Sequence, residues 1–469
     1  MTTGLVEMKR GRIDGASRAL ERSAASSPRA RPVGSRVYIE TYGCQMNIND
    51  TELMEGLLRK RGFLRVGEPE SADVILINTC AIREHAERRV IGRIGELQKH
   101  RRENGDLVLG VTGCMAQRLG DQLLGGAPAV DLVAGPDAYR ALPSLIESIQ
   151  ENALERGQAL LALDKAENYE GVASVRGEGV SAWITVQRGC DHRCTFCIVP
   201  YVRGGEKNRD PLAILDEARA AVGQGYSEVV LLGQTVNSYR VDGWDFSRLL
   251  RAVGRLDGIR RVRFISPHPN DVTEALLEVI AEEPSVCRQL HLPVQSGSNR
   301  VLKRMVRRYT AESFLDKVDL ARRIVPEIAL STDVIVAFPG ETAVEYEETL
   351  DLMKLARFDD AYLYKYSLRD GTPATRFPEE EFVSDDVGSD RLARLIGVHR
   401  DIQREINQRE VGSWREVLIE RPARSKDDLQ GRTESNKIVA FPGDPNKIGD
   451  YMSVRLTGTT GSTFMGVPW

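Results

Sequence analysis

The sequence feature that most constrains the fold is a group of three cysteines, at positions 190, 194 and 197. They lie on one loop directly after a β-like run at residues 182–187. Three thiolates at this spacing can each bind one iron of a [4Fe–4S] cluster and leave the fourth iron without a protein ligand. A catalytic metal needs such an open position. A zinc knuckle would need a fourth ligand, and His192 inside the loop is poorly placed to supply it.

The loop belongs to a series of β-like runs that alternate with helical patterns along the sequence. Such alternation predicts a partial (β/α)6 barrel resembling a TIM barrel, with the chemistry at the carboxyl ends of the parallel strands. The cysteine loop follows the first of these strands and is therefore expected at the barrel mouth. The runs are residues 182–187, 228–232, 262–265, 289–292, 331–337 and 361–366, and the helical stretches include 211–222, 272–281, 311–324 and 344–356.

A second α/β series precedes the first, with β-like runs at residues 37–41, 74–78, 107–112 and 132–134 and helices at 50–61 and 84–102. Cys44, Cys80 and Cys114 each follow one of the first three runs. Neighbouring parallel strands lie about 4.8 Å apart, so the three cysteines are expected to converge on a second metal site. The alternative is three unrelated buried cysteines, which the repeated position disfavours. Cys287 has no such partner and is expected to be a core residue.

The pattern changes again at Gly412, where short β-like runs at 414–419, 437–441 and 451–456 predict a small all-β barrel. The expected domains are a disordered leader (1–35), an N-terminal cluster domain (36–150), a linker (151–179), the barrel (180–411) and the small β domain (412–469). The leader could instead be a mitochondrial transit peptide, but Glu7, Asp14 and Glu21 count against that.

Composition excludes several classes of protein. No apolar run reaches the roughly 20 residues that a membrane span needs. Seven cysteines without a secretory signal do not indicate a disulfide scaffold. The formal net charge is −4, so nucleic-acid binding would have to come from local basic patches.

From about residue 36 onward the chain resembles the methylthiotransferases of the radical S-adenosylmethionine (SAM) superfamily, which join a cluster domain, a radical SAM barrel and a TRAM domain. The resemblance rests on the two cysteine triads and four further motifs. These are Leu-Gly-Gln-Thr-Val-Asn-Ser-Tyr at 232–239, His-Leu-Pro-Val-Gln-Ser-Gly at 291–297, Asp-Val-Ile-Val-Ala-Phe-Pro-Gly-Glu-Thr at 333–342 and Gly-Arg-Thr-Glu-Ser-Asn-Lys at 431–437.

The motif Thr-Tyr-Gly-Cys-Gln-Met-Asn at 41–47 resembles the MiaB-type branch, which acts on N6-isopentenyladenosine next to the tRNA anticodon. The resemblance implies two [4Fe–4S] clusters, two SAM molecules per reaction and transfer of a methylthio group to C2 of the adenine. Sibling branches act on a ribosomal-protein aspartate or on threonylcarbamoyl-adenosine, and both remain alternatives. An RNA-binding iron–sulfur carrier without catalytic activity is a further alternative, disfavoured by the open iron.

The metal ligands expected are Cys44, Cys80, Cys114, Cys190, Cys194 and Cys197. SAM contacts are expected from Phe196, Gln234, Asn237, Gln295 and Ser296, each of which could equally have a packing or turn role. RNA contacts are expected from Arg203, Lys207, Arg209, Lys303, Arg304, Arg307, Arg308, Arg432 and Lys437, and also from Arg83, Arg88, Arg89, Arg93 and Arg300, although charge runs are usually solvated faces. The expected partners are the tRNA anticodon stem-loop and an electron donor such as flavodoxin or ferredoxin, for a cytoplasmic monomer.

Overall fold

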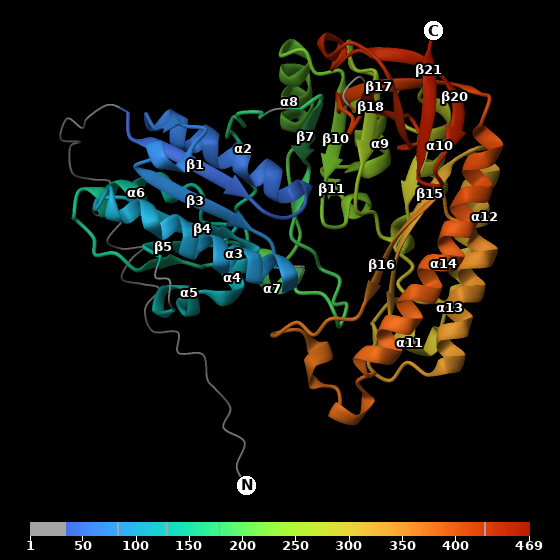
Figure 1. The fold of residues 1–469 in the computed structure, drawn as a ribbon, viewed down its shortest axis with the longest axis horizontal. Coiled ribbons are helices and arrows are strands. Elements are labelled where there is room, and N and C mark those ends of the chain that lie inside the picture. The colour runs from blue at the N-terminus through green and yellow to red at the C-terminus, as the bar shows by residue number, and fades with distance from the viewer. Residues whose placement is uncertain (1–33, 82–83, 127–129, 178, 426–427) are drawn as a thin grey trace. The chain divides into compact units, whose positions relative to one another are not determined.

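The computed structural model describes residues 34–81, 84–126, 130–177, 179–425 and 428–469, so most of the expected leader lies outside the described residues. The described chain forms two compact units (Figure 1). Unit one contains residues 34–177 together with Val199–Gly205. Unit two contains residues 179–198 and Glu206–Trp469. The chain therefore leaves unit two directly after the second cysteine triad and returns to it at Glu206.

Unit one is built on a parallel six-stranded sheet in the order β2-β1-β3-β4-β5-β6. Four of these strands were predicted from the sequence. The other two are the edge strands: β2 has only two residues, and β6 is half-buried throughout and falls in the segment expected to be a linker. The strands are β1 (Arg36–Thr41), β2 (Leu64–Arg65), β3 (Val74–Thr79), β4 (Val108–Gly113), β5 (Leu132–Ala134) and β6 (Gln158–Leu160).

Helices cover both faces of this sheet (Figure 1). Val74 and Leu76 of β3 pack under α2 (Gln45–Lys60) and α6 (Leu142–Gln150). The alternate residues Ile75 and Ile77 pack under α3 (Glu84–Leu97) and α4 (Cys114–Leu119), with α5 (Asp121–Gly125) nearby. All six residues of β3 are buried, as expected for a central parallel strand covered on two sides.

Unit two contains six parallel strands that follow one another in sequence order, which confirms the partial barrel. A hydrogen bond from Cys287 N to Val262 O (3.0 Å) connects the first three strands to the last three. Cys287 is buried, as predicted. The strands are β7 (Ser181–Thr185), β10 (Glu228–Leu232), β13 (Arg261–Phe264), β14 (Gln289–His291), β15 (Ala329–Val336) and β16 (Asp360–Lys365).

Helices pack against these strands around one large apolar core. They are α8 (Pro211–Gly223), α9 (Phe246–Gly254), α10 (Glu274–Glu282), α12 (Ala311–Ile324) and α13 (Ala343–Ala356). Shorter elements are α7 (Val199–Arg203) in unit one, and α11 (Asn299–Arg304), β8 (Gln187–Arg188), β9 (Lys207–Asn208), β11 (Arg240–Val241) and β12 (Trp244–Asp245) in unit two. The 3-10 helices are Pro69–Ser71, Gln98–Arg102, Val236–Ser238, Pro269–Asp271, Pro373–Arg376, Glu379–Glu381 and Pro445–Lys447.

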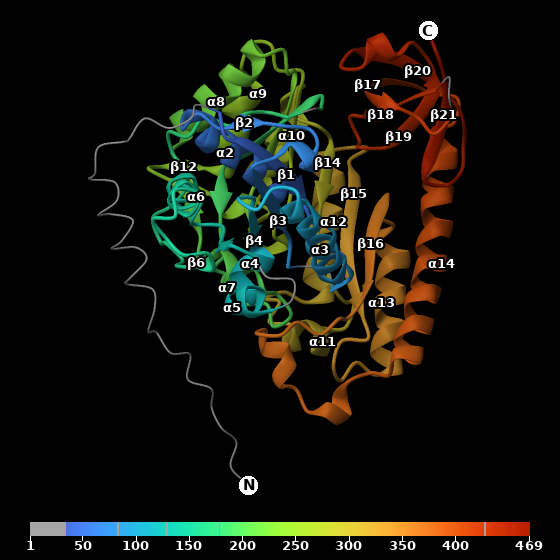
Figure 2. The ribbon, with the colours of Figure 1, turned by 60° about the vertical axis from the view of Figure 1, so that its left-hand side comes forward.

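The long helix α14 (Asp385–Glu410) runs beside α13 and leads into a closed five-stranded barrel, as Figures 1 and 2 show. Its strand order is β17-β18-β19-β21-β20. The sequence predicted three of its strands and missed β18 and β21, whose glycine, threonine and glutamine residues weaken the apolar alternation. The strands are β17 (Trp414–Pro422), β18 (Asp428–Thr433), β19 (Ile438–Pro442), β20 (Tyr451–Thr459) and β21 (Thr463–Pro468).

Two buried arginines fasten this barrel to the larger one. Arg261, the first residue of β13, donates to the carbonyl of Arg432 (2.9 Å), and Arg263 donates to the carbonyl of Thr433 (2.7 Å). The small barrel is therefore attached at the amino-terminal end of β13, whereas the chemistry of a β/α barrel lies at the carboxyl ends of the strands.

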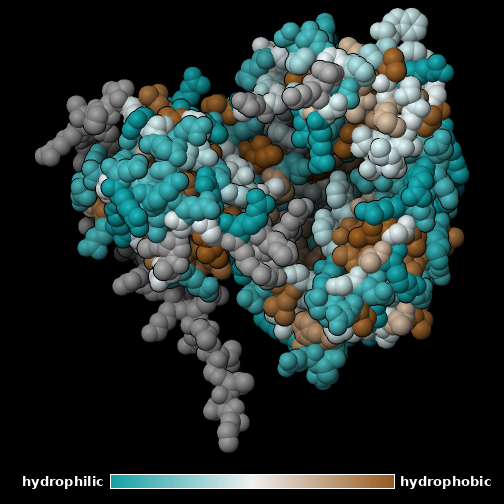
Figure 3. All heavy atoms as spheres, in the orientation of Figure 1, coloured by the Kyte–Doolittle hydropathy of each residue, from teal (hydrophilic) through white to brown (hydrophobic). Residues whose placement is uncertain are grey.

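Hydrophobic residues on the face shown in Figure 3 are interspersed with hydrophilic ones. Among the described residues, no helix combines the length and the apolar character needed to cross a membrane.

Candidate functional site

The first candidate site lies at the carboxyl edge of the sheet in unit one. Cys44 caps the N-terminus of α2 just after β1, Cys80 directly follows β3, and Cys114 is the first residue of α4 just after β4. The strands β1, β3 and β4 are adjacent and parallel. The topology therefore brings the three thiols to one edge of the sheet, as the sequence predicted.

Glycines allow the three loops to approach closely. Gly43 has a φ of +140°, and a Cβ at this position would lie 2.6 Å from the Cβ of Cys80. Gly113 has a φ of +92°, and its Cβ would lie 2.5 Å from the carbonyl oxygen of Thr79. Only a residue without a side chain tolerates both the backbone conformation and the contact.

A buried amide pair connects the first two cysteine loops. Asn47 donates from Nδ2 to the carbonyl of Thr79 (3.1 Å), and Asn78 donates from Nδ2 to the carbonyl of Asn47 (2.7 Å). Asn78 also donates to the hydroxyl of Thr51 (2.9 Å). The loops are thus held in position independently of any metal, which pre-organises the thiols.

The thiols of this site differ in acidity. A hydrogen bond from Cys80 lowers the pKa of Cys44 to about 6, and the nearby charge of Arg203 and the backbone N–H groups that open α2 act in the same direction. Burial raises the pKa of Cys114, against the opposing charge of Arg203. Thiolates are the metal-binding form, so one of these three thiols is already poised for deprotonation near neutral pH.

Arg203 is the residue of this site that sequence reasoning assigned elsewhere. Its side chain is only 4% exposed and its Nε donates to Cys114 Sγ at 3.1 Å. Its Nη2 donates to Asp50 Oδ2 at 2.7 Å, and that carboxylate is fully buried. A guanidinium in this position is not on the surface where an RNA phosphate could reach it. The sequence signal for a buried polar partner such as Arg203 was the set of polar residues on the buried side of α2, namely Asn47, Asp50 and Thr51.

The second candidate site is the cysteine loop of unit two, between β8 and α7. Neighbouring polar groups contact two of its sulfurs. Cys190 Sγ lies 3.1 Å from the hydroxyl of Thr235, and Arg307 donates from Nη1 to Cys194 Sγ at 3.3 Å. The middle of the loop is anchored through Thr195, whose amide donates to the carbonyl of Met305 (3.1 Å). The loop is therefore fixed by contacts from several segments of unit two.

His192 does not turn toward the cysteines. Its ring stacks on that of His268, with centroids 3.9 Å apart and planes 9° apart, and its Nε2 lies 3.4 Å from Asp271. Burial, with the nearby charges of Arg307 and His192, lowers the pKa of His268 to about 2, so this ring is neutral. Because the two rings are parallel, their nitrogen lone pairs do not point toward a common position. This geometry disfavours binding of one metal ion by both histidines.

The expected SAM contacts follow the barrel strands, and their environments differ. Gln234 comes after β10, and its Oε1 is buried with no hydrogen-bond donor among the described residues. Asn237 binds the backbone of His268 through both ends of its amide (2.9 and 2.7 Å). Ser296 is fully buried beside Thr349, Gln295 is buried in a left-handed conformation (φ 72°), and Phe196 packs against the cluster of Val301, Met305, Phe338 and Ala374.

Most of the expected RNA contacts are occupied within the protein. Arg209 donates to the carbonyl of Thr185 and to Glu217, both at 2.7 Å, and Lys207 is buried. Arg304 pairs with Glu381, Arg432 with Glu420, and Arg93 with Glu40. Arg83 and the side chain of Arg88 lie outside the described residues. Exposed positions are held by Lys303, Arg308 and Arg89.

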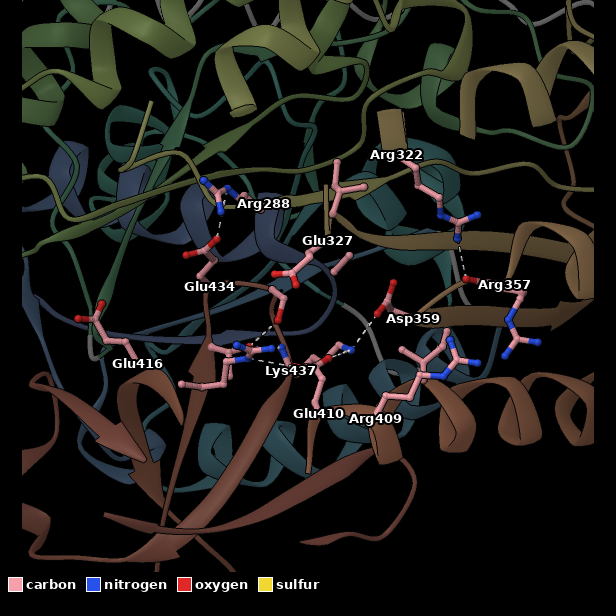
Figure 4. Close-up of a pocket in the computed structure, with 16 residues that line it drawn as sticks. Arg288, Arg322, Glu327, Arg357, Asp359, Arg409, Glu410, Glu416, Glu434 and Lys437 are labelled. Atoms are coloured by element: carbon pink, nitrogen blue, oxygen red, sulfur yellow. Dashed lines mark hydrogen bonds and ion pairs between the residues drawn. The ribbon is translucent and has the colours of Figure 1, made fainter. Parts of the chain in front are cut away.

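Lys437 lines a charged cavity of about 690 Å³ between the two barrels of unit two (Figure 4). Its ammonium group lies between Asp359 (2.8 Å) and Glu410. Arg288 and Glu434 form a looser pair across the same cavity (4.0 Å). Acidic and basic groups alternate along its walls, so the cavity provides no uniform field for an anionic ligand.

Comparison with known proteins assigns the chain to a class. The model of the uncharacterized protein family UPF0004 matches residues 36–135, that of the radical SAM superfamily residues 184–353, and that of the TRAM domain residues 408–463. A similar solved structure is the radical SAM methyltransferase TsrM from Kitasatospora setae, at a TM-score of 0.56 and 16% identity over 72% of this chain and 75% of that one. Fold and cysteine loop together define a radical SAM protein with an added N-terminal domain and a TRAM domain.

Closer relatives identify the family. The tRNA-2-methylthio-N6-dimethylallyladenosine synthase of Carboxydothermus hydrogenoformans is 43% identical over 90% of this chain and 96% of its own length. The synthase of the same name from Chloroherpeton thalassium is 41% identical over 92% of this chain and 96% of its own length. The chain belongs to the tRNA-2-methylthio-N6-dimethylallyladenosine synthase family.

Proposed function

We infer that this chain is a radical SAM methylthiotransferase that converts N6-isopentenyladenosine next to the tRNA anticodon into its 2-methylthio derivative. One observation carries the inference: one cysteine triad at the carboxyl ends of three parallel strands and a second triad on the loop after β7 and β8 occur in a chain that aligns with its relatives along nearly their whole length. One triad alone would support radical chemistry without sulfur transfer. The second triad supplies the site from which sulfur can be delivered.

Cys190, Cys194 and Cys197 would hold one [4Fe–4S] cluster and leave an iron open for the amino and carboxylate groups of SAM. Cys44, Cys80 and Cys114 would hold the other cluster. Buried polar atoms without partners among the described residues fit these assignments: there, Gln234 Oε1 after β10 lacks a donor and Arg203 Nη1 lacks an acceptor. When bound, the clusters and SAM supply the radical that attacks an unreactive C–H bond, and the sulfur and methyl that replace the hydrogen.

The chain's own residues position and protect these groups. Arg307 and Thr235 contact the sulfurs of Cys194 and Cys190, so the ligand loop keeps one geometry. Gln234 could accept a hydrogen bond from the amino group or a ribose hydroxyl of SAM. Cys190 and Cys194 are buried, which shields the ligand loop from solvent.

The proposed partners follow from the substrate. The anticodon stem-loop is polyanionic, and the exposed Lys303 and Arg308 are the cations at the barrel mouth best placed to meet phosphates. Reducing equivalents would come from a flavodoxin or ferredoxin. We propose that the protein acts in the cytoplasm as a monomer.

The decisive experiment expresses the chain in a host that lacks its own tRNA methylthiotransferase, followed by mass spectrometry of digested tRNA. We expect 2-methylthio-N6-isopentenyladenosine to appear. Unmodified isopentenyladenosine in the presence of intact clusters would overturn the substrate assignment, and modification of a ribosomal-protein aspartate or of threonylcarbamoyl-adenosine would replace it.

Two variants separate the roles of the clusters. Cys194→Ala should abolish formation of 5′-deoxyadenosine. Cys80→Ala should still allow 5′-deoxyadenosine to form but should stop methylthio transfer. Product formation by Cys80→Ala would exclude the N-terminal triad as the source of sulfur. Cys287→Ala is the matched control, because this buried cysteine contributes to neither triad.

A further inference from the structure

Arg203 places a positive charge in the interior of unit one, next to the proposed cluster ligands. It comes from α7, the short segment that follows the second cysteine triad and packs against α4. Its carboxylate partner Asp50 is itself held by the hydroxyl of Tyr139 (3.4 Å). A buried ion pair is costly to form unless all of its hydrogen bonds are made.

One of those hydrogen bonds is missing. Nε of Arg203 is used by Cys114 and Nη2 by Asp50, but Nη1 is buried and has no acceptor among the described residues. Buried donors in folded proteins almost always have a partner. The guanidinium fork therefore presents an unused N–H donor beside the sulfur that it already binds.

The second cysteine site provides a comparison. Arg307 also donates to a cysteine sulfur, but its Nη2 donates to the carbonyl of Pro293 (2.9 Å) and its Nε to the hydroxyl of Tyr309 (2.8 Å). None of its nitrogens is left buried without a partner. The open donor of Arg203 thus distinguishes it from Arg307, and an acceptor brought by a bound group would satisfy this donor.

We propose that Arg203 is a positioning residue for the N-terminal cluster, with Nε holding the sulfur of Cys114 and Nη1 donating to a sulfur atom of the cluster. This inference rests on the proposed ligand role of Cys44, Cys80 and Cys114. Three thiolates make the cluster anionic, and reduction adds a further negative charge. A buried cation with N–H···S hydrogen bonds stabilises the reduced form more than the oxidised form, so it raises the reduction potential.

The test uses the full chain with Cys190, Cys194 and Cys197 replaced by alanine, so that only the N-terminal cluster can form after anaerobic reconstitution. Arg203→Met and Arg203→Lys are compared with this parent by iron and sulfide content and by a redox titration followed by electron paramagnetic resonance. Arg101→Met is the matched control, because Arg101 also pairs with a buried carboxylate of unit one, Asp131.

We expect the midpoint potential to shift to more negative values in Arg203→Met and by less in Arg203→Lys, with no shift in Arg101→Met. Loss of iron in Arg203→Met alone, at an unchanged melting temperature of the apo-protein, also supports the proposal. If Arg203→Met does not fold, the midpoint potential of Arg203→Lys tests the proposal. Unchanged iron content and potential in the folded Arg203 variants overturn the proposal. A parent without iron overturns the ligand assignment, and the role of Arg203 with it.

Discussion

Arg307 donates a hydrogen bond from Nη1 to the Sγ of Cys194 at 3.3 Å, and the same guanidinium also binds the hydroxyl of Tyr309 and the carbonyl of Pro293. In unit one, Arg203 contacts Cys114 in a comparable way. Each proposed cluster site thus contains a buried arginine on one ligand sulfur. Hydrogen bonds to such sulfurs set the orientation of the ligand and the potential of the cluster.

Replacing Arg307 should therefore impair radical formation. We expect Arg307→Met to lower the yield of 5′-deoxyadenosine about 10- to 100-fold, because the sulfur of Cys194 loses its donor. The measurement is chromatographic quantification after dithionite reduction. Arg323→Met, at an exposed arginine of α12, should leave the yield unchanged. An undiminished yield in Arg307→Met would exclude a role for this contact.

Gly43→Ala should disrupt the N-terminal site. The new Cβ would need a φ of +140° and would lie 2.6 Å from the Cβ of Cys80. We expect a loss of about 1–3 kcal/mol in the free energy of unfolding, together with a lower iron content. Urea denaturation and iron analysis measure the two effects. At Gly67 the φ is not in the left-handed region and a Cβ would meet no atom of the described residues within 4 Å, so Gly67→Ala should behave like the native chain.

The pair between Arg300 and Glu345 should make stability depend on pH. A hydrogen bond from Arg300 is the main cause that lowers the pKa of Glu345 from 4.5 to about 2. The folded state thus favours the charged carboxylate of Glu345. The contribution of this carboxylate to the free energy of unfolding is complete above pH 4.5 and is lost as the pH falls toward 2.

Glu345→Gln tests this dependence. We expect the free energy of unfolding of the variant to be lower at pH 7 by about 1–2 kcal/mol. The loss is smaller than for a pair shielded from solvent, because Arg300 is half exposed. The difference in melting temperature from the native chain should narrow as the pH is lowered below 4.5. Glu347→Gln, in an exposed pair with Arg394, is the control. A difference that stays constant with pH would contradict the assignment.

Lys303 and Arg308 should contribute to tRNA binding through phosphate contacts. Replacing both with alanine should weaken binding uniformly and lower the slope of log K against log salt concentration by about 1 per residue. Filter binding at several salt concentrations measures the slope. An unchanged slope would place the RNA on another surface.

Lys437 should affect stability and leave tRNA affinity intact. In Lys437→Met the partly buried Asp359 and Glu410 lose their shared cation. Breaking a fully buried ion pair lowers the free energy of unfolding by about 3–5 kcal/mol. Because water partly reaches these two carboxylates, we expect a loss at or below the lower end of that range. Calorimetry should show a lower melting temperature, while the salt slope for tRNA stays at the native value. A folded variant of native stability with weakened tRNA binding would restore the role that the sequence motif suggested.

The cysteine triads and the order of the domains were readable from the sequence because they depend on local patterns. Apolar strands that alternate with helical stretches predict parallel sheets, and a cysteine just past the end of each of three such strands must reach the same edge. The strand β2 was missed because two residues carry no period, and β6 was missed because it is half-buried and lacks the apolar run of the equally short β5. The strands β18 and β21 were missed because Gly431, Thr433 and Gly466 occupy buried positions where apolar side chains would have shown the alternation.

The sequence by itself determined which atoms bind metal in this proposal and which class of chemistry they support, because thiolate chemistry and ligand spacing are local properties. Only the tertiary structure decided where the basic side chains point. Arg203, Arg307 and Lys437 were expected on the RNA-binding surface, yet each is directed inward onto cysteine sulfurs or carboxylates. A charged side chain enters the interior only where distant segments supply its partners, and Asp50 and Cys114 meet Arg203 across 153 and 89 residues of chain. No local pattern records such a meeting.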